Sequence, residues 1–304
     1  MKLTFGSHTV ETSNDDKVLF PRDSLTKGDL IEYYADVADL MLPHLRERCL
    51  TLQRFPDGLG KDGFFQQNYS DHFPDFIDRR SLPTAAGDEK VDHIVANNAA
   101  ALVYLANQAA ITFHGWLATA DAPRHPDRVV FDLDPSGDDF RAIVDCARLL
   151  REALELTGLV PFVMTTGSSG LHVIAPLDPR GTFDNVREFA GEVAAATAAK
   201  QPRRFTTEQR KAARRGRLYI DIGRNAYGQT GVLPYSVRAI EGAPVATPLD
   251  WDELGRGDLS PRRYDIGNLR RRLAQKGDPF ADFFSHKRRP APDPGALREW
   301  REEK

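Results

Sequence analysis

The stretch of chain that most constrains the fold is a short apolar run that ends in two aspartates. Residues 128–135 are Arg-Val-Val-Phe-Asp-Leu-Asp-Pro. A short run of apolar and β-branched residues that is closed by a turn is typical of a buried strand. Because side chains alternate along a strand, Asp132 and Asp134 point to one face and Leu133 to the other. The sequence therefore predicts two adjacent carboxylates at the end of a buried strand.

Two adjacent carboxylates repel each other, and burying that repulsion is costly unless a cation neutralises it. Mg²⁺ and Mn²⁺ prefer oxygen ligands of this kind. A metal site is therefore one interpretation of the motif, and a simple turn that begins at Asp134 is the other. The two aspartates alone favour neither interpretation.

Composition sets broad limits on the class of protein. The 304 residues suffice for one large domain or two smaller ones, and the contents of hydrophobic (41%) and charged (28%) residues are typical of soluble globular proteins. We find neither an apolar run of about 18 residues nor a signal-peptide pattern. Cys49 and Cys146 do not suggest a disulfide framework. We therefore expect a cytoplasmic protein with no membrane partner.

Positive charge is concentrated in two parts of a chain whose net charge is −3. Residues 200–217 contain eight Lys or Arg and one acid, and Arg262, Arg263 and residues 270–272 form a second basic group. Such runs are more often solvated surface than binding sites. A basic patch on a near-neutral protein can nevertheless bind phosphate backbones.

Two later predicted strands also end in polar groups. Residues 162–175 suggest two strands joined by the loop 167–170, with His172 just after the loop, and Asp221 ends a strand at 216–222. Three carboxylates are a common way to hold two divalent ions for phosphoryl transfer. The Gly-Ser loop offers hydroxyls and backbone N–H groups to phosphates. His172 as a phosphate donor and His172 as a core histidine are equally compatible with this pattern.

Residues 1–115 carry weaker indications of function. Thr26 is the predicted N-cap of a helix that runs to about residue 43, and Lys17, Lys27 and that helix terminus could hold an anion. Spacing alone favours two merely exposed lysines. Phe64 and Phe65 point to opposite faces, so at least one of them could be exposed and stack on a base, although a second small core is commoner. Residues 70–93 are predicted to be a loop.

Four motifs in order resemble the archaeo-eukaryotic primase superfamily, and most closely the polymerase domain of bacterial DNA ligase D and its stand-alone relatives. The resemblance covers roughly residues 10–285 and rests on Phe131–Pro135, Thr165–His172, Tyr219–Asp221 and Pro234–Arg238. It implies an α/β primase-polymerase fold, in which a central, mostly antiparallel sheet carries the three aspartates between flanking helices. We expect this domain to span 1–286, with an N-terminal subdomain (1–115), a catalytic core (116–286) and a tail or linker (287–304).

The resemblance also implies an activity. It predicts a template-dependent nucleotidyltransferase that adds nucleotides, preferably ribonucleotides, at DNA ends or short gaps with a 5′-phosphate, during non-homologous end joining or gap filling. Two Mn²⁺ or Mg²⁺ ions are the implied cofactors. The implied partners are primer-template DNA, NTP or dNTP, Ku and a DNA ligase, at the nucleoid.

The family's functional residues map onto matching positions of this chain. Asp132, Asp134 and Asp221 match its metal ligands. The family's nucleotide-binding residues match His114, Thr166, Ser168, His172 and Arg238. Its 5′-phosphate pocket matches Asn14, Lys17 and Lys27. Its template and primer contacts match Phe64, Phe65 and Arg214. Ser169 replaces a lysine usual in the Gly-Ser loop, which could shift triphosphate contacts to Arg54 or Arg224. Thr166 replaces a serine and keeps the hydroxyl.

Two alternatives compete with the polymerase interpretation. Phe131-Asp-Leu-Asp also resembles the nucleophile motif of haloacid-dehalogenase-type phosphatases, where Gly-Thr normally follows near the start of a parallel sheet. Here Pro135-Ser136 follows instead. The other alternative is a non-catalytic module that binds and bridges 5′-phosphorylated ends. Three carboxylates argue against it, because their repulsion gives a binding module no advantage.

Overall fold

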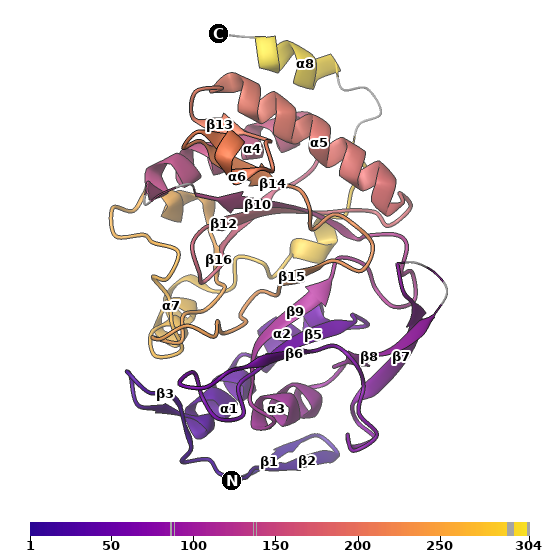
Figure 1. The fold of residues 1–304 in the computed structure, drawn as a ribbon, viewed down its shortest axis with the longest axis vertical. Coiled ribbons are helices and arrows are strands. Elements are labelled where there is room, and N and C mark those ends of the chain that lie inside the picture. The colour runs from indigo at the N-terminus through magenta and orange to yellow at the C-terminus, as the bar shows by residue number, and fades with distance from the viewer. Residues whose placement is uncertain (86, 88, 136, 138, 291–294, 303–304) are drawn as a thin grey trace. The chain divides into compact units, whose positions relative to one another are not determined.

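The computed structural model describes residues 1–302 except 86, 88, 136, 138 and 291–294. The chain forms two compact units, each of which contains a six-stranded sheet (Figure 1). The first unit comprises Met1–Asp121, Thr230–Thr247 and Tyr264–Gly277, and the second comprises Ala122–Gln229, Pro248–Arg263 and Asp278–Lys304. This division differs from the expected boundary near residue 115, because two later segments return to the first unit.

The sheet of the first unit has the strand order β15-β9-β5-β8-β7, and β6 also pairs with β5. Every pairing in it is antiparallel. Its strands are β5 (Leu50–Arg54), β6 (Phe64–Gln66), β7 (Asp78–Pro83), β8 (Lys90–Val95), β9 (Ala110–Trp116) and β15 (Thr230–Val232). Two small hairpins accompany it, β1 (Lys2–Phe5) with β2 (His8–Glu11), and β3 (Val18–Phe20) with β4 (Leu25–Thr26).

The helices of this unit are α1 (Lys27–Asp36), α2 (Ala38–Leu45), α3 (Ala99–Asn107) and α7 (Leu269–Lys276). Thr26 caps α1 as predicted, since its hydroxyl accepts from the backbone of Asp29 and the Asp29 carboxylate accepts in return. The single helix predicted to residue 43 is two helices, which meet at Val37.

The prediction of a loop at residues 70–93 is wrong. Asp78–Pro83 and Lys90–Val95 form the hairpin β7-β8, which is paired over six residues of each strand. The outer strand β7 has only one buried residue, Leu82, and exposes Arg79 and Ser81 to solvent. An edge hairpin with so few buried residues lacks the apolar alternation that identifies a strand.

The sheet of the second unit has the strand order β13-β14-β10-β12-β11-β16. All its pairings are antiparallel except that between β13 and β14, which confirms the predicted mostly antiparallel sheet. Its strands are β10 (Arg128–Asp134), β11 (Phe162–Thr165), β12 (Leu171–Pro176), β13 (Phe205–Thr206), β14 (Leu218–Asp221) and β16 (Pro248–Leu249).

Helices α4 (Phe140–Leu156) and α5 (Phe183–Lys200) pack on this sheet and on each other (Figure 1). Shorter elements complete the unit, namely α6 (Lys211–Arg214), the 3₁₀ helices η1 (Trp251–Gly255) and η2 (Phe283–His286), and α8 (Gly295–Glu302). Helix α8 replaces part of the expected tail, because Leu297 is buried in its contact with α5. No helix in the described parts of the chain is both long and apolar enough to cross a membrane.

A buried asparagine completes the pairing of the central strand. Strand β14 ends opposite Asp132, and the Asn225 side chain then takes over the bonding to β10. Its Oδ1 accepts from the Val130 N–H at 2.9 Å and its Nδ2 donates to the Val130 carbonyl at 2.7 Å. Asn225 is fully buried, so this amide replaces a missing strand residue.

We expect Asn225→Ala to destabilise the protein by about 2–4 kcal/mol, because it leaves a buried N–H and a buried carbonyl of Val130 without partners. Chemical denaturation at neutral pH measures this loss. Exposed Gln229, four residues later, is the control, and Gln229→Ala should change the free energy of unfolding by less than about 0.5 kcal/mol. Equal effects of the two substitutions would contradict the assigned role of Asn225.

Candidate active site

A row of polar residues crosses three neighbouring strands of the second unit. Asp132 on β10 lies opposite His172 on β12 and opposite Asp221 on β14. Residues opposite each other in antiparallel strands share a face of the sheet. Asp134, two residues further along β10, shares that face and lies opposite Tyr219. The register therefore gathers three carboxylates and an imidazole on one face.

Each carboxylate at the centre of the row has polar neighbours. Asp132 Oδ1 lies 3.4 Å from His172 Nε2, and its Oδ2 lies 3.7 Å from Arg224 Nε. Asp221 Oδ1 accepts from the Gly223 N–H at 2.7 Å and from the Tyr219 hydroxyl at 3.2 Å. These contacts offset part of the cost of holding negative charge at a site where Asp132 is only 8% exposed.

The electrostatics of the row are dominated by negative charge. Burial, and after it the charges of Asp132 and Asp221, together raise the pKa of Asp134 to about 6. Arg214 and Arg224 oppose this shift. The site therefore favours any cation that neutralises the carboxylates.

Carboxylate oxygens are the ligands that a hard divalent cation prefers, and three carboxylates that repel one another share this face. The side chains are not gathered around one point, however. Over the described residues, no group of three or more His, Cys, Asp or Glu is arranged to hold a metal ion. Asp132 is turned toward His172 and Arg224, and Asp221 toward Tyr219. Metal binding would require these side chains to turn toward one another.

The Gly-Ser loop lies directly on the strand that carries the acids. A Cβ built on Gly170 would lie 2.1 Å from the Leu133 carbonyl oxygen, so only glycine fits there. The Thr166 hydroxyl accepts from the backbone N–H of Gly170 at 3.2 Å and of Ser168 at 3.3 Å. Thr166 therefore shapes the loop, and the structure gives it this role in addition to the predicted nucleotide contact.

Arg214, predicted to contact the primer, lies close to the row. Its guanidinium carbon lies 4.0 Å from the centre of the Tyr219 ring, and its Nε donates to the Glu208 carbonyl at 3.1 Å. Tyr219 is a site residue to which the sequence assigned no role. Strand alternation could have identified it, because it lies two positions before Asp221.

Four predicted contact residues lie on β5, β6 and β9 of the first unit. Arg54 lies opposite Phe64, and its guanidinium sits 5.3 Å from that ring. The same guanidinium donates to the Gln108 carbonyl and to Gln66. The rings of Phe65 and His114 lie 6.3 Å apart. Phe64 and Phe65 are 47% and 65% exposed, so both aromatic rings are available for contacts.

Arg238 also belongs to the first unit, in a segment fixed by two tyrosines. The Tyr33 hydroxyl donates to the Tyr235 carbonyl at 2.7 Å, and the Val237 N–H donates to the Tyr34 hydroxyl at 3.0 Å. The backbone N–H of Arg238 donates to Pro244 at 2.7 Å. This segment has no regular secondary structure, and these hydrogen bonds hold it in place.

The predicted 5′-phosphate residues lie together at the start of α1. The Lys27 N–H donates to the Lys17 carbonyl at 2.8 Å, and the Lys17 N–H donates to the Asn14 carbonyl at 3.1 Å. Lys27 is 5% exposed, and its ammonium donates to the Asn107 carbonyl at 3.2 Å. Burial lowers the pKa of Lys27, while Asp15 opposes that shift and Lys17 adds to it. Lys27 is thus a buried cation at a helix N-terminus.

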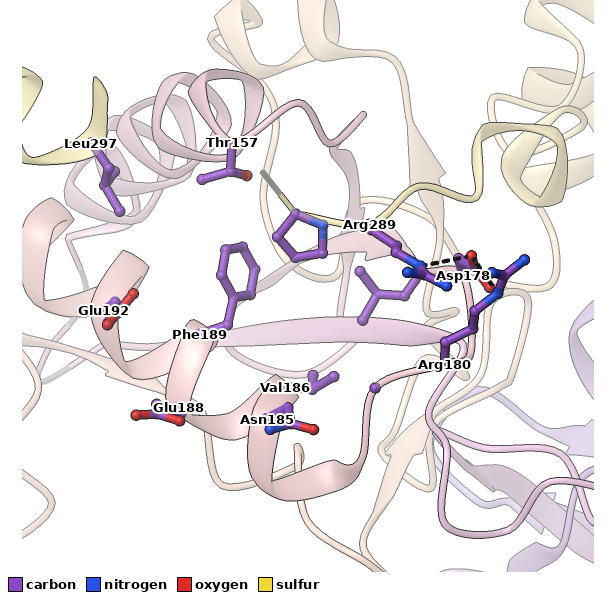
Figure 2. A pocket seen from close by; sticks show the side chains of 13 residues that line it. Thr157, Asp178, Arg180, Asn185, Val186, Glu188, Phe189, Glu192, Arg289 and Leu297 are labelled. Atoms are coloured by element: carbon purple, nitrogen blue, oxygen red, sulfur yellow. Dashed lines mark hydrogen bonds and ion pairs between the residues drawn. The ribbon is translucent and has the colours of Figure 1, made fainter. Parts of the chain in front are cut away.

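One cavity of the second unit, of about 580 Å³, contains none of the predicted site residues among its lining (Figure 2). It lies beside α5, with Phe189 and Val186 in its wall. At its rim Asp178 pairs with Arg180 at 3.2 Å and with Arg289 at 3.1 Å. This cavity is therefore separate from the acidic row and does not indicate where its chemistry takes place.

The fold and the acidic row together define a class of protein, the primase-polymerases. Residues 26–280 match the model of the family described as "LigD, primase-polymerase domain". The match covers most of the chain, which therefore belongs to this family. The antiparallel pairing on both sides of β10 contradicts the phosphatase alternative, which places the motif on a parallel sheet.

Relatives and a solved structure support this assignment. The bifunctional non-homologous end joining protein LigD of Bacillus subtilis is 35% identical over 271 residues, or 88% of this chain and 43% of that protein. The multifunctional non-homologous end joining DNA repair protein LigD of Mycobacterium tuberculosis is 32% identical over 298 residues, or 92% of this chain and 39% of that protein. The chain thus spans less than half the length of these relatives.

The solved structure is the polymerase domain of Mycobacterium tuberculosis ligase D in complex with DNA. It has a TM-score of 0.85 and 29% sequence identity, and the match covers 91% of this chain and 99% of that chain. The expected α/β primase-polymerase fold is therefore confirmed.

We expect Asp134→Asn to stabilise the protein in the presence of a chelator at pH 7.5, by on the order of 2 kcal/mol. The pKa of Asp134 is raised to about 6 in the folded state, so its ionisation costs stability as the pH rises from about 4 to about 6. An asparagine avoids that cost. The difference from wild type should vanish below pH 4.

Thermal unfolding at pH 7.5 and pH 4, with a chelator present, measures both effects. Exposed Asp62 provides the control, and Asp62→Asn should leave the melting temperature unchanged at both values of pH. If Asp134→Asn is no more stable than wild type at pH 7.5, the inferred repulsion among the three carboxylates is absent.

Proposed function

We propose that this chain is a DNA repair polymerase that transfers nucleotides to a primer end at a DNA break or short gap during non-homologous end joining. Its membership of the LigD primase-polymerase family supports the proposal, as do relatives that are end joining proteins. The single observation that carries it is the register that puts Asp132 opposite Asp221, with Asp134 on the same face.

We propose further that Asp132, Asp134 and Asp221 hold two divalent cations, Mn²⁺ or Mg²⁺. Such ions activate a primer 3′-hydroxyl and neutralise charge on the departing diphosphate. The chain's own groups position the reactants. His172, 3.4 Å from Asp132, would donate to a phosphate oxygen, and Arg224 would exchange its contact with Asp132 for a phosphate when metal occupies the carboxylates.

The finer features of the activity are proposals that rest on the family resemblance. They include the preference for ribonucleotides, the use of gaps with a 5′-phosphate, and the contacts of His114, Arg54 and Arg238 with the nucleotide. Cooperation with Ku and a DNA ligase belongs to the same set, as does action at the nucleoid.

A second candidate function is a module that binds 5′-phosphorylated DNA ends without catalysis. The buried ammonium of Lys27 beside Lys17, at the N-terminus of α1, favours phosphate binding. The two functions can coexist in one protein. They are separated by whether loss of a carboxylate abolishes nucleotide addition.

We expect Asp132→Ala to reduce single-nucleotide incorporation by roughly a hundredfold or more, while affinity for gapped DNA stays within about twofold. The assay uses a gap with a 5′-phosphate, with rNTP and dNTP compared in Mn²⁺ and in Mg²⁺, and so it also tests the sugar and metal preferences. Asp184→Ala, at an exposed position of α5, is the control and should retain wild-type activity. Near-normal extension by Asp132→Ala would refute the metal-ligand role.

We expect Lys27→Ala and Lys27→Met to weaken binding to a gap that carries a 5′-phosphate by roughly tenfold, because each removes a charge-assisted hydrogen bond. Binding to the same gap with a 5′-hydroxyl should not change. The methionine variant keeps the buried apolar stem, which controls for a packing defect. Lys2→Ala, at an exposed lysine, should bind both substrates normally, and equal losses on the two gaps would remove the pocket.

A further inference from the structure

The chain that follows β15 stays bonded to β9 through side-chain hydroxyls. Strand β15 pairs with β9 as far as His114. Next along β9, the Phe113 N–H donates to the Ser236 hydroxyl at 2.8 Å, and the Thr112 hydroxyl accepts from the Ala239 N–H at 3.2 Å. Each hydroxyl stands where a further strand residue would offer a backbone group. The irregular segment after β15 is therefore tied to β9 even though it is not a strand.

Tyr34 of helix α1 joins β9 to the same segment from inside the core. Its hydroxyl donates to the Ile111 carbonyl of β9 at 2.6 Å and accepts from the Val237 N–H at 3.0 Å. The Tyr34 side chain is 0% exposed, and its ring packs edge-on against Phe113 with the ring centres 4.9 Å apart. One buried hydroxyl thus bridges two backbone groups in a place where water does not substitute for it.

The bridge ends directly beside Arg238. Val237 precedes Arg238 in the chain, and the N–H of the next residue, Ala239, is held by Thr112. The backbone of Arg238 is therefore fixed on both sides. Burial raises the pKa of Tyr34, while its hydrogen bonds and the charge of Arg238 oppose that shift. The guanidinium charge thus lies within electrostatic range of the bridging hydroxyl.

We propose that Tyr34 is a positioning residue, whose hydroxyl holds Arg238 at the place from which it binds the incoming nucleotide. A guanidinium binds phosphate oxygens through a planar set of donors, so a shift of its backbone misaligns those bonds. Loss of the bridge therefore weakens nucleotide binding without removing a group that touches the nucleotide. The nucleotide contact of Arg238 rests on the proposed function, whereas the positioning of Arg238 by Tyr34 does not.

The first test is steady-state incorporation of one nucleotide by Tyr34→Phe on a gap with a 5′-phosphate. KM for the nucleotide should rise roughly fivefold or more and kcat should change less than about twofold, because the arginine contact is present before and during the reaction. Affinity for the gapped DNA alone should not change. An unchanged KM would overturn the proposal.

Two further variants control for loss of stability. Thr197→Val removes another buried hydroxyl, which donates to the Val193 carbonyl of α5 at 2.8 Å, and should keep KM within about twofold of wild type. Ser236→Ala removes the bond to Phe113 from the same network, so it should raise KM in the same direction as Tyr34→Phe. It replaces Tyr34→Phe in every test if that variant does not fold.

The second test asks whether the effect passes through Arg238. Arg238→Ala should raise KM roughly tenfold. Adding Tyr34→Phe to it should raise KM by less than about twofold more, because residues that act through one contact are not additive. If Tyr34→Phe multiplies KM by the same factor with and without Arg238, the hydroxyl acts through another group and the proposal is wrong.

The third test follows the segment itself by hydrogen exchange, with no substrate present. In Tyr34→Phe the Val237 amide should exchange roughly tenfold faster or more, and by a larger factor than the amides of α3 in the same unit. Equal factors at Val237 and in α3 would mean that the hydroxyl contributes only to stability, which contradicts the proposal. Faster exchange confined to the segment, in a protein whose wild type incorporates no nucleotide, keeps the positioning role and removes the polymerase function.

Discussion

Electrostatic repulsion among carboxylates held on one face of a sheet is the constraint on which the second unit depends. The antiparallel register places Asp132 opposite Asp221, and strand alternation adds Asp134 to the same face. Backbone pairing fixes the strands, so the charges can separate only as far as their side chains rotate. The rest of the repulsion must be offset by neighbouring donors or by a cation. That requirement links the geometry of the sheet to the chemistry proposed for it.

The neighbouring groups are arranged around this repulsion. His172, Arg224, Tyr219 and the Gly223 N–H each contact a carboxylate. Asn225 continues the pairing of β10 where β14 has ended, which keeps the acidic end of β10 in place. A set of donors that offsets part of the negative charge without cancelling it leaves a site that still favours cations.

The first unit also contains a buried charge, but this charge is positive. Lys27 is buried at the N-terminus of α1, where burial disfavours its charge and the helix adds partial positive charge. An anion at this position would relieve both effects.

The sequence by itself determined the local features of this protein, namely the acidic strand end, the face shared by Asp132 and Asp134, the Thr26 cap and the family motifs. These follow from side-chain period and from residues close in sequence. Only the tertiary structure decided which strands pair. Pairing over long sequence distances placed Asp221 opposite Asp132, returned residues 230–247 and 264–277 to the first unit, and brought Arg262 to the Gly-Ser loop. Helix α8 could not be identified from the sequence for the same reason, because it packs against the distant helix α5. The hairpin β7-β8 was missed for a local reason, because its outer strand lacks apolar alternation.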